Sequence, residues 1–276
     1  MEIAPEKLRK LQLLELEILL EVKRICEKHT IPFVLIGGTL IGAVRHNGFI
    51  PWDDDVDIGM LREHFDIFCK IAPDELSEKY FLQTPETDST CGSYSCARLR
   101  LEGTIFITNT QPKNWKHTGL CVDIFPYDNI PNLYILGSLY WNVFNVFIRA
   151  YWFRLGYQPH PQNVVARMVM HLGRALCIPI PTNTLKKFLE KYHKKYENLN
   201  SKYVVLLPGS WGFRRERHLR ETLIKTTSLP FEGTLMPVPE NYDMFLREQY
   251  GDYMTPPPAE ERKMRHAIEI DFGIYS

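Results

Sequence analysis

The segment from residue 35 to residue 60, LIGGTLIGAVRHNGFIPWDDDVDIGM, constrains the fold more than any other part of the chain. It continues an apolar run, PFVLI, that stops at Gly37 and Gly38, which predicts a buried strand leading into a tight turn. TLIGAVRH then predicts a short helix, and DDDVDIGM alternates acidic and apolar residues with the period of a strand. We therefore expect a strand, a glycine turn, a helix and an acidic strand in succession.

The segments around this unit predict a mixed sheet with flanking helices. PEKLRKLQLLELEILLEVKRICEKHT predicts a long amphipathic helix that ends near Thr30 and Pro32. LREHFDIFCKIA predicts another helix, and YFLQTP, YSCARLRL, TIFITN and LCVDIFP predict strands. The apolar stripe of the first helix consists of Leu8, Leu11, Leu14, Ile18, Leu19, Val22 and Ile25.

The pattern changes near residue 131. Residues 133–155, 163–178 and 183–199 predict helices separated by proline-rich segments. TLIKTTSLPFEGTLMPVP then predicts a hairpin turning at Glu232-Gly233, and ENYDMFLREQYG a closing helix capped by Gly251. We expect an α+β fold with a core at 1–130, a helical insertion or subdomain at 131–200 and a segment at 201–276 that completes the core.

The acidic strand has the chemistry of a cation site. Asp53, Asp55 and Asp57 are predicted to share one face. Carboxylates roughly 4 to 7 Å apart repel by roughly a few kcal/mol at an effective dielectric constant of about 20, and a cation relieves this repulsion. Aspartates bunched in a sequence also occur in solvated turns, which is the alternative interpretation.

Two further features would complete such a site. Gly37 and Gly38 at a helix start let a phosphate approach the helix amides closely, and Mg²⁺ prefers carboxylate and phosphate oxygens together. Asp123 stands alone among apolar residues in LCVDIFP. Because an uncompensated buried carboxylate is costly, Asp123 is expected either to bind metal or to pair with Arg98 or Arg100.

These segments together resemble the LicD family, a branch of the nucleotidyltransferase-fold superfamily that includes the fukutin-related proteins. The resemblance rests on residues 35–60, on RLR at 98–100, on VDIFPYD at 122–128 and on LPFEGTLMPVPENYDMFLREQYGDYMTPPP at 229–258. It implies a nucleotidyltransferase-like mixed sheet core and leaves residues 131–200 without a counterpart.

The resemblance also implies an activity and a site. Members typically transfer phosphocholine from CDP-choline to a sugar hydroxyl of a bacterial cell-surface glycan precursor, such as teichoic acid or lipopolysaccharide, and release CMP. Relatives move other groups, including ribitol phosphate. By motif position, the contacts to the donor phosphate would come from Gly37, Gly38 and Thr39, and the ligands of Mg²⁺ or Mn²⁺, with two ions expected, would be Asp55, Asp57 and Asp123.

Several neighbouring residues are further candidates. Arg45 is expected to contact a donor or acceptor phosphate, and His46 or a carboxylate to accept the proton of the acceptor hydroxyl. Trp52 could stack on a base, cover a quaternary ammonium group or pack in the core. Asp53 and Asp54 either orient metal-bound water or are plain turn residues, and Arg98 either contacts phosphate or forms a salt bridge. Tyr250, Asp252 and Tyr253 either close over the site or pack in the C-terminal lobe. The isolated His266 is the last candidate.

Charge and composition limit the partners. The 33 basic and 33 acidic residues balance, so no overall electrostatic field favours binding of nucleic acid. Nucleic acid is therefore not expected as a partner. The first residues lack a signal-peptide pattern and the cysteines form no CxxC motif, which favours the cytoplasm. Residues 129–155 are rich in aromatic residues; they are expected either to pack as a buried helix or to lie peripherally on the inner face of the cytoplasmic membrane, where a lipid-linked glycan would be presented.

Three other functions remain compatible with these residues. A glycosyltransferase also uses a DxD motif and a metal, but a larger nucleotide-binding region normally precedes it. Transfer of a nucleotidyl group would release pyrophosphate. A scaffold that binds nucleotide or glycan without chemistry is the third alternative, which the presence of all three acids disfavours.

Overall fold

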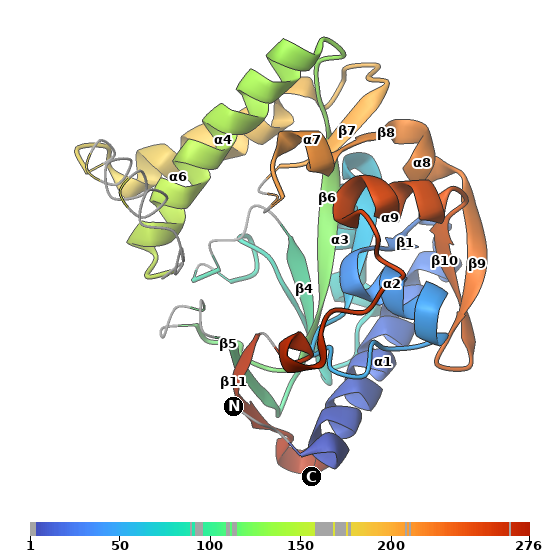
Figure 1. Cartoon of the computed structure of the whole chain (residues 1–276). Coiled ribbons are helices and arrows are strands. Elements are labelled where there is room, and N and C mark those ends of the chain that lie inside the picture. The colour runs from blue at the N-terminus through green and yellow to red at the C-terminus, as the bar shows by residue number, and fades with distance from the viewer. Residues whose placement is uncertain are drawn as a thin grey trace.

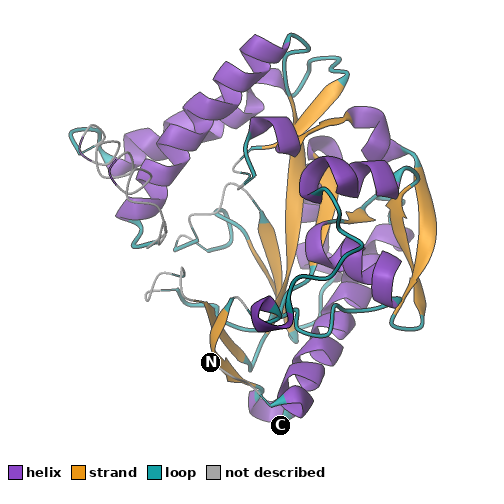
Figure 2. Ribbon diagram, in the orientation of Figure 1, coloured by secondary structure: helices purple, strands orange, loops and turns teal. Residues whose placement is uncertain are grey.

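The computed structural model describes residues 4–88, 90, 91, 96–108, 111, 115–157, 168, 175, 178–207, 209, 211–264 and 266–276. Helices and strands surround a central mixed sheet (Figures 1 and 2). The helices are α1 (Pro5–Lys28), α2 (Gly37–His46), α3 (Arg62–Glu75), α4 (Tyr134–Arg154), α6 (Thr182–His193), α7 (Phe213–Glu216), α8 (Arg220–Ile224) and α9 (Tyr242–Tyr250). The strands are β1 (Val34–Leu35), β2 (Asp57–Leu61), β3 (Tyr80–Gln83), β4 (Ala97–Leu101), β5 (Ile105–Thr108), β6 (Cys121–Asn129), β7 (Tyr203–Leu206), β8 (Arg217–Leu219), β9 (Thr226–Phe231), β10 (Thr234–Pro239) and β11 (Ala267–Asp271).

The long strand β6 organises the main sheet. It pairs in parallel with β2, antiparallel with β4, and through its C-terminal residues antiparallel with β7. The sheet order is β1-β2-β6-β4-β3, and β7 joins β8 beyond this row. Two further antiparallel pairs, β9 with β10 and β5 with β11, lie outside it. The α+β fold class is therefore confirmed.

The structure corrects two boundaries in the glycine and acidic segments. α2 begins at Gly37 itself, so the glycine pair lies in the first helical turn rather than before it. β2 begins only at Asp57, where its register with β6 begins opposite Asp123. The predicted alternation nevertheless extends upstream, since Asp54 is buried while Asp53 and Asp55 are partly exposed.

The other predicted elements of the core are confirmed. The turn of the β9–β10 hairpin is Glu232-Gly233, with φ of 50° and 77°, and α9 ends at Gly251 with φ of 75°. Such positive φ values suit glycine and explain both turn positions. α1 begins with Pro5 in its first turn and buries the predicted stripe, except that Leu8 and Leu14 are only partly buried.

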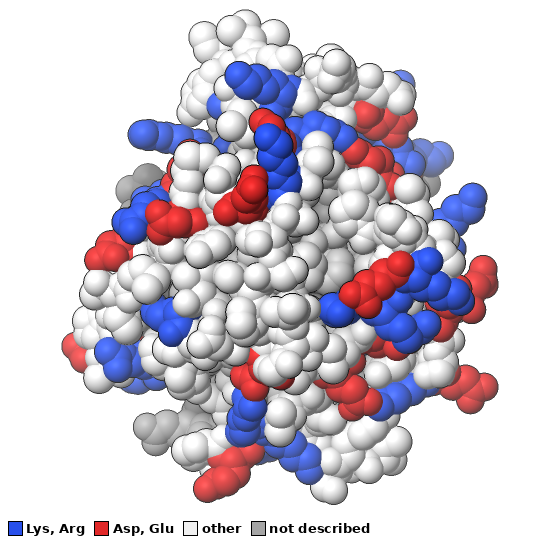
Figure 3. Space-filling view, turned by 90° about the vertical axis from the view of Figure 1, so that its right-hand side faces the viewer, with Lys and Arg blue, Asp and Glu red and all other residues white. Residues whose placement is uncertain are grey.

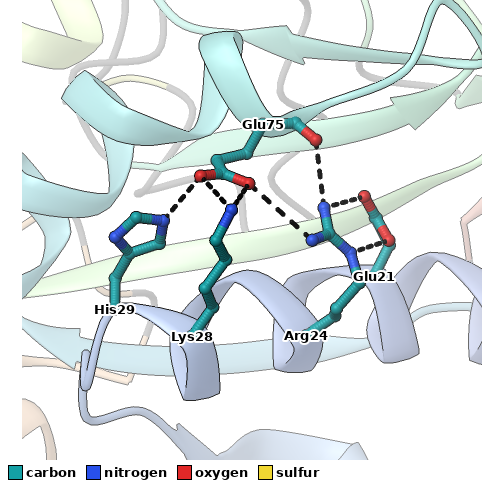
Figure 4. A network of polar contacts seen from close by, with 5 residues as sticks. All are labelled: Glu21, Arg24, Lys28, His29 and Glu75. Carbon is teal, nitrogen blue, oxygen red and sulfur yellow. Dashed lines mark hydrogen bonds and ion pairs between the residues drawn. The ribbon is translucent and has the colours of Figure 1, made fainter.

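A polar network fastens the end of α1 to the end of α3 (Figure 4). The Glu75 carboxylate accepts hydrogen bonds from Lys28 Nζ at 2.8 Å and pairs with His29 Nε2 at 2.8 Å. Arg24 donates to the Glu75 carbonyl oxygen at 3.0 Å and to Glu21. Because these groups lie at the surface, they fix the relative position of the two helices more than they add stability.

The helices α4 and α6 pack against each other and meet the rest of the molecule at β7 and α7 (Figure 1). They share a second hydrophobic cluster with β7 and α7, built around Trp141, Phe144, Leu189, Val205 and Phe213. The predicted helices at 133–155 and 183–199 correspond to α4 and to α6 with a 3-10 turn at Lys194–Tyr196. Most of the predicted helix 163–178 lies outside the described residues, and the three-part domain division stays a prediction.

Two surface properties bear on partners. No helix in the described part of the chain is long and apolar enough to cross a membrane. On the side of the molecule that carries β9 and β10, basic and acidic side chains are interspersed without a large area of one sign (Figure 3).

Candidate active site

Strand register brings the predicted acids together. In the parallel pair of β2 and β6, Asp57 lies directly opposite Asp123. In the antiparallel pair of β6 and β4, Asp123 lies opposite Arg98. Neighbouring strands are about 4.8 Å apart, so these side chains form one row across the sheet. Arg98 Nε lies 2.8 Å from Asp123 Oδ1, which makes the predicted Arg98 pairing a fact and leaves metal binding by Asp123 a prediction.

The C-terminal strand holds the acidic segment in place. The buried Asp54 carboxylate accepts hydrogen bonds from the backbone amides of His266 at 3.1 Å and Ala267 at 2.9 Å. The side chain of His266 lies 3.2 Å from Asp55 Oδ2. Residues more than 200 positions apart in the sequence therefore fix the acids, and the isolated His266 of the sequence belongs to the site.

The start of α2 faces the same acids. Gly37 has φ of 58°, and a Cβ added there would lie 3.0 Å from Asp57 Oδ2. A Cβ at Gly38 would lie 2.5 Å from Asp53 Oδ2. Thr39 Oγ1 accepts a hydrogen bond of 2.9 Å from the Asp57 amide. Glycine is thus needed for the close approach of α2 to the acids, and donor-phosphate binding by these residues stays a prediction.

Burial and mutual repulsion raise the pKa values of Asp55 and Asp57. Burial, opposed by His266 and supported by the charges of Asp54 and Asp123, raises the pKa of Asp55 to about 6. Burial and the charges of Asp55 and Asp123 raise the pKa of Asp57 well above its usual range. The carboxylates therefore outnumber the positive groups that compensate them, and carboxylate oxygens in this number suit Mg²⁺ or Mn²⁺.

The present side-chain arrangement is not a closed metal shell. Among the described residues, no three His, Cys, Asp or Glu side chains stand in an arrangement that could hold a metal ion. Asp55 faces His266 and Asp123 faces Arg98 instead. The donor atoms fit a divalent cation in kind, and holding one requires these carboxylates to turn from their present partners.

A cavity of about 130 Å³ lies beside the acids and includes a residue that the sequence analysis missed. Glu15 of α1 is fully buried, and neither of its carboxylate oxygens has a hydrogen-bond partner in the described part of the chain. Burial and the nearby charges, Asp55 foremost, raise its pKa well above the usual range. The cavity is lined by Glu15, Asp55, Val56, Arg98, Arg100, Phe106, Thr108, Gln111, Trp115, Cys121, Asp123, Tyr157 and His266.

Three predicted residues lie outside the cavity, and their roles stay predictions. Arg45, His46 and Trp52 do not line this cavity, and His46 lies at the opposite end of α2 from Gly37, about 13 Å away at the rise of an α-helix. Arg45 donates to the Tyr253 carbonyl oxygen at 2.8 Å and to His46 Nε2 at 3.0 Å. Burial, together with the Arg45 charge, lowers the pKa of His46.

His46 and Trp52 pack against each other, and one of the predicted closing residues at 250–253 approaches the glycine turn. The rings of His46 and Trp52 meet edge to face at 6.4 Å, and Arg262 lies over Trp52 at 5.3 Å. Tyr250 approaches Gly37, its hydroxyl being 3.7 Å from an added Cβ, whereas Asp252 pairs with Thr255 at the surface. Tyr250 is thus the residue of this segment that reaches the acids.

Comparison with known proteins places the chain among phosphotransferase relatives. The family model described as LicD/FKTN/FKRP, nucleotidyltransferase domain, matches residues 30–155, which include the glycine pair and all three predicted metal ligands. The lipopolysaccharide cholinephosphotransferase LicD of Haemophilus influenzae is 31% identical over 272 residues, which cover 95% of this chain and 97% of that protein. An uncharacterised protein of Rickettsia prowazekii is 31% identical over 112 residues, or 40% of this chain and 39% of that protein.

Proposed function

The chain belongs to the LicD family, and from this membership we propose that it is a phosphotransferase that moves phosphocholine from CDP-choline to a sugar hydroxyl of a lipopolysaccharide precursor. The relative from Haemophilus influenzae, named for cholinephosphate transfer to lipopolysaccharide, matches almost the full length of both chains. Within the structure, one observation supports the proposal most: Asp57 and Asp123 lie opposite each other across β2 and β6, next to a glycine-lined helix start.

The cation site would be built from Asp55, Asp57 and Asp123. A bound Mg²⁺ or Mn²⁺, or two such ions, would offset the charge of the donor diphosphate and of the departing CMP. The amides at the start of α2 lie beside these acids and would bind donor phosphate oxygens, since Gly37 and Gly38 leave room for them.

The chain's own side chains would then position the reacting groups. The oxygen of the acceptor hydroxyl attacks the phosphorus that carries choline, a new phosphorus–oxygen bond forms, and the bond to CMP breaks with its electron pair leaving on CMP. The proton of the hydroxyl would pass to a side chain of the cavity that does not hold the cation. His266 lines the cavity 3.2 Å from Asp55 and is placed to accept it once Asp55 turns to the cation. The earlier candidate His46 lies at the far end of α2.

Arg98 has a second role in this scheme. Its guanidinium pairs with Asp123, while its Nη1 is buried without a hydrogen-bond partner in the described residues. If Asp123 held a cation instead of Arg98, the guanidinium would be available to a phosphate oxygen. A positively charged group at this position lowers the energy of a transition state in which phosphate charge builds up.

A donor panel with product identification tests the proposal. The protein is incubated with Mg²⁺, a lipopolysaccharide-derived oligosaccharide and, in turn, CDP-choline, CDP-ribitol, a sugar nucleotide and ATP. Mass spectrometry should find CMP and a phosphocholine-modified oligosaccharide with CDP-choline alone. Release of a nucleoside diphosphate would indicate a glycosyltransferase, and release of pyrophosphate a nucleotidyltransferase.

Two controls separate the remaining alternatives. A teichoic acid fragment replaces the oligosaccharide, and its modification in preference to the oligosaccharide would contradict the lipopolysaccharide assignment. Calorimetric binding of CDP-choline without any product, in the presence of each acceptor, would indicate a scaffold rather than an enzyme.

A further inference from the structure

One face of α4 is apolar and exposed in the described part of the chain. Residues spaced by three or four positions along the whole helix are exposed, which places them on a single stripe. The stripe consists of Ile135, Leu139, Asn142, Val146, Arg149 and Phe153. Four of these six side chains are large and apolar, and Ile135 is 72% exposed and Leu139 60% exposed.

The opposite face of α4 already has its partners. Tyr140, Trp141, Phe144 and Ile148 are buried against α6, β7 and α7. A helix that covers a soluble core normally presents charged or polar side chains outward, and a helix apolar all round is typical of a core interior or of contact with lipid. α4 therefore has more apolar surface than its packing against α6, β7 and α7 requires.

The charge near α4 is mostly positive. No Asp or Glu occurs from residue 129 to residue 189, whereas the whole chain is balanced at 33 basic and 33 acidic residues. The described basic residues of this stretch are Arg149, Arg154, Lys186 and Lys187, and the next acid along the chain, Glu190, pairs with Lys186 on α6. Next to the start of α4, where Tyr134 packs against Phe213 at 5.2 Å, α7 adds the exposed Arg214 and Arg215.

We propose that the outer face of α4 lies flat on an anionic lipid bilayer, with its apolar side chains among the acyl chains and its basic neighbours at the headgroups. Amphipathic surface helices with basic flanks bind anionic membranes in this way. A second copy of the chain fits less well, because a two-fold contact across this stripe would oppose only positive charges. The absence of a spanning helix in the described residues is compatible with a surface contact.

The position of α4 gives this contact a consequence for the site. The chain leaves α4 and reaches Tyr157, which lines the cavity beside Asp55 and Asp123. Docking of α4 would hold that cavity close to the bilayer, where a lipid-linked glycan is presented. This consequence rests on the proposed function, but the contact itself does not.

Vesicle flotation tests the contact without any donor or acceptor. The whole protein is mixed with vesicles of phosphatidylcholine alone or with phosphatidylglycerol added. We expect it to float with the anionic vesicles and less with the neutral ones, and Ile135→Glu combined with Leu139→Glu to weaken the partition about tenfold or more. The matched control is Leu235→Glu on β10, since Leu235 is 61% exposed outside the stripe and its replacement should leave flotation unchanged.

Three outcomes would overturn the proposal. These are failure of the wild-type protein to float with anionic vesicles, equal flotation of the double variant, and a dimer in analytical ultracentrifugation that the double variant converts to a monomer. Circular dichroism of each variant shows whether the fold is retained. If the protein floats but releases no CMP from CDP-choline, the proposed function fails while the membrane contact stands.

Discussion

Replacing Glu15 with glutamine should stabilise the protein at neutral pH and have no effect in acid. Glu15 is fully buried without a hydrogen-bond partner in the described residues, and burial, with Asp55 next in importance, raises its pKa well above the ordinary value of 4.5. The folded protein therefore keeps a proton that the unfolded chain releases. The stability of the wild type must fall as pH rises from 4.5 towards the folded pKa.

The size of the effect follows from this linkage. One proton of difference costs at most about 1.4 kcal/mol per pH unit, so the loss accumulated between pH 4.5 and pH 7 is at most about 3.5 kcal/mol. Glutamine resembles the protonated acid and does not titrate. Glu15→Gln should thus match the wild type at pH 4 and exceed its free energy of unfolding at pH 7 by up to about 3.5 kcal/mol.

Urea unfolding at a series of pH values measures this difference. In an Asp55→Asn background the gain from Glu15→Gln should shrink, because Asp55 is the largest charge that raises the Glu15 pKa. A gain that is the same at every pH, or a loss of stability at pH 7, would refute the interpretation of Glu15 as a buried acid in the field of the cluster.

Three other substitutions test the site. Asp57→Asn should lower CMP release by about a hundredfold or more without lowering the melting temperature at neutral pH, because it removes a proposed cation ligand and relieves repulsion; unchanged turnover would contradict the ligand assignment. Asp54→Asn should lower the free energy of unfolding in urea by about 1–3 kcal/mol, since two backbone amides lose a charged acceptor, and an unchanged value would show that this tie is unimportant. Gly37→Ala should cost about 1–2 kcal/mol through its φ of 58° and raise the KM for the donor more than that for the acceptor; equal effects on both would argue against a donor-phosphate contact.

The sequence predicted the local elements well because their signals are local. The stripe of α1, the alternation around Asp55 and the hairpin turn at Glu232-Gly233 are each contained within a few neighbouring residues. The start of β2 was predicted too early. The start of a strand depends on its partner, and the pairing of Asp57 with Asp123 of β6 is not encoded in the acidic segment.

The site was predictable only in part, because it is assembled from distant segments. The motif resemblance named Asp57 and Asp123, but their register across β2 and β6 is a tertiary property. The contact of His266 with Asp55 has no local signal at all. Glu15 did have one, since it lies four positions after Leu11 and three before Ile18, within the apolar stripe of α1. An acid in such a stripe is costly to bury, and this cost marks a position worth testing.

We propose that the acids around Asp57 and Asp123 transfer phosphocholine between a nucleotide donor and a sugar hydroxyl. ³¹P NMR of CDP-choline and a lipopolysaccharide-derived oligosaccharide with added Mg²⁺ tests this transfer. We expect CMP and an oligosaccharide phosphodiester to appear together in equal amounts with the wild type, and neither to appear with Asp57→Asn. Equal product formation by the two proteins would contradict this proposal. So would release of CMP together with free phosphocholine while the oligosaccharide stays unmodified.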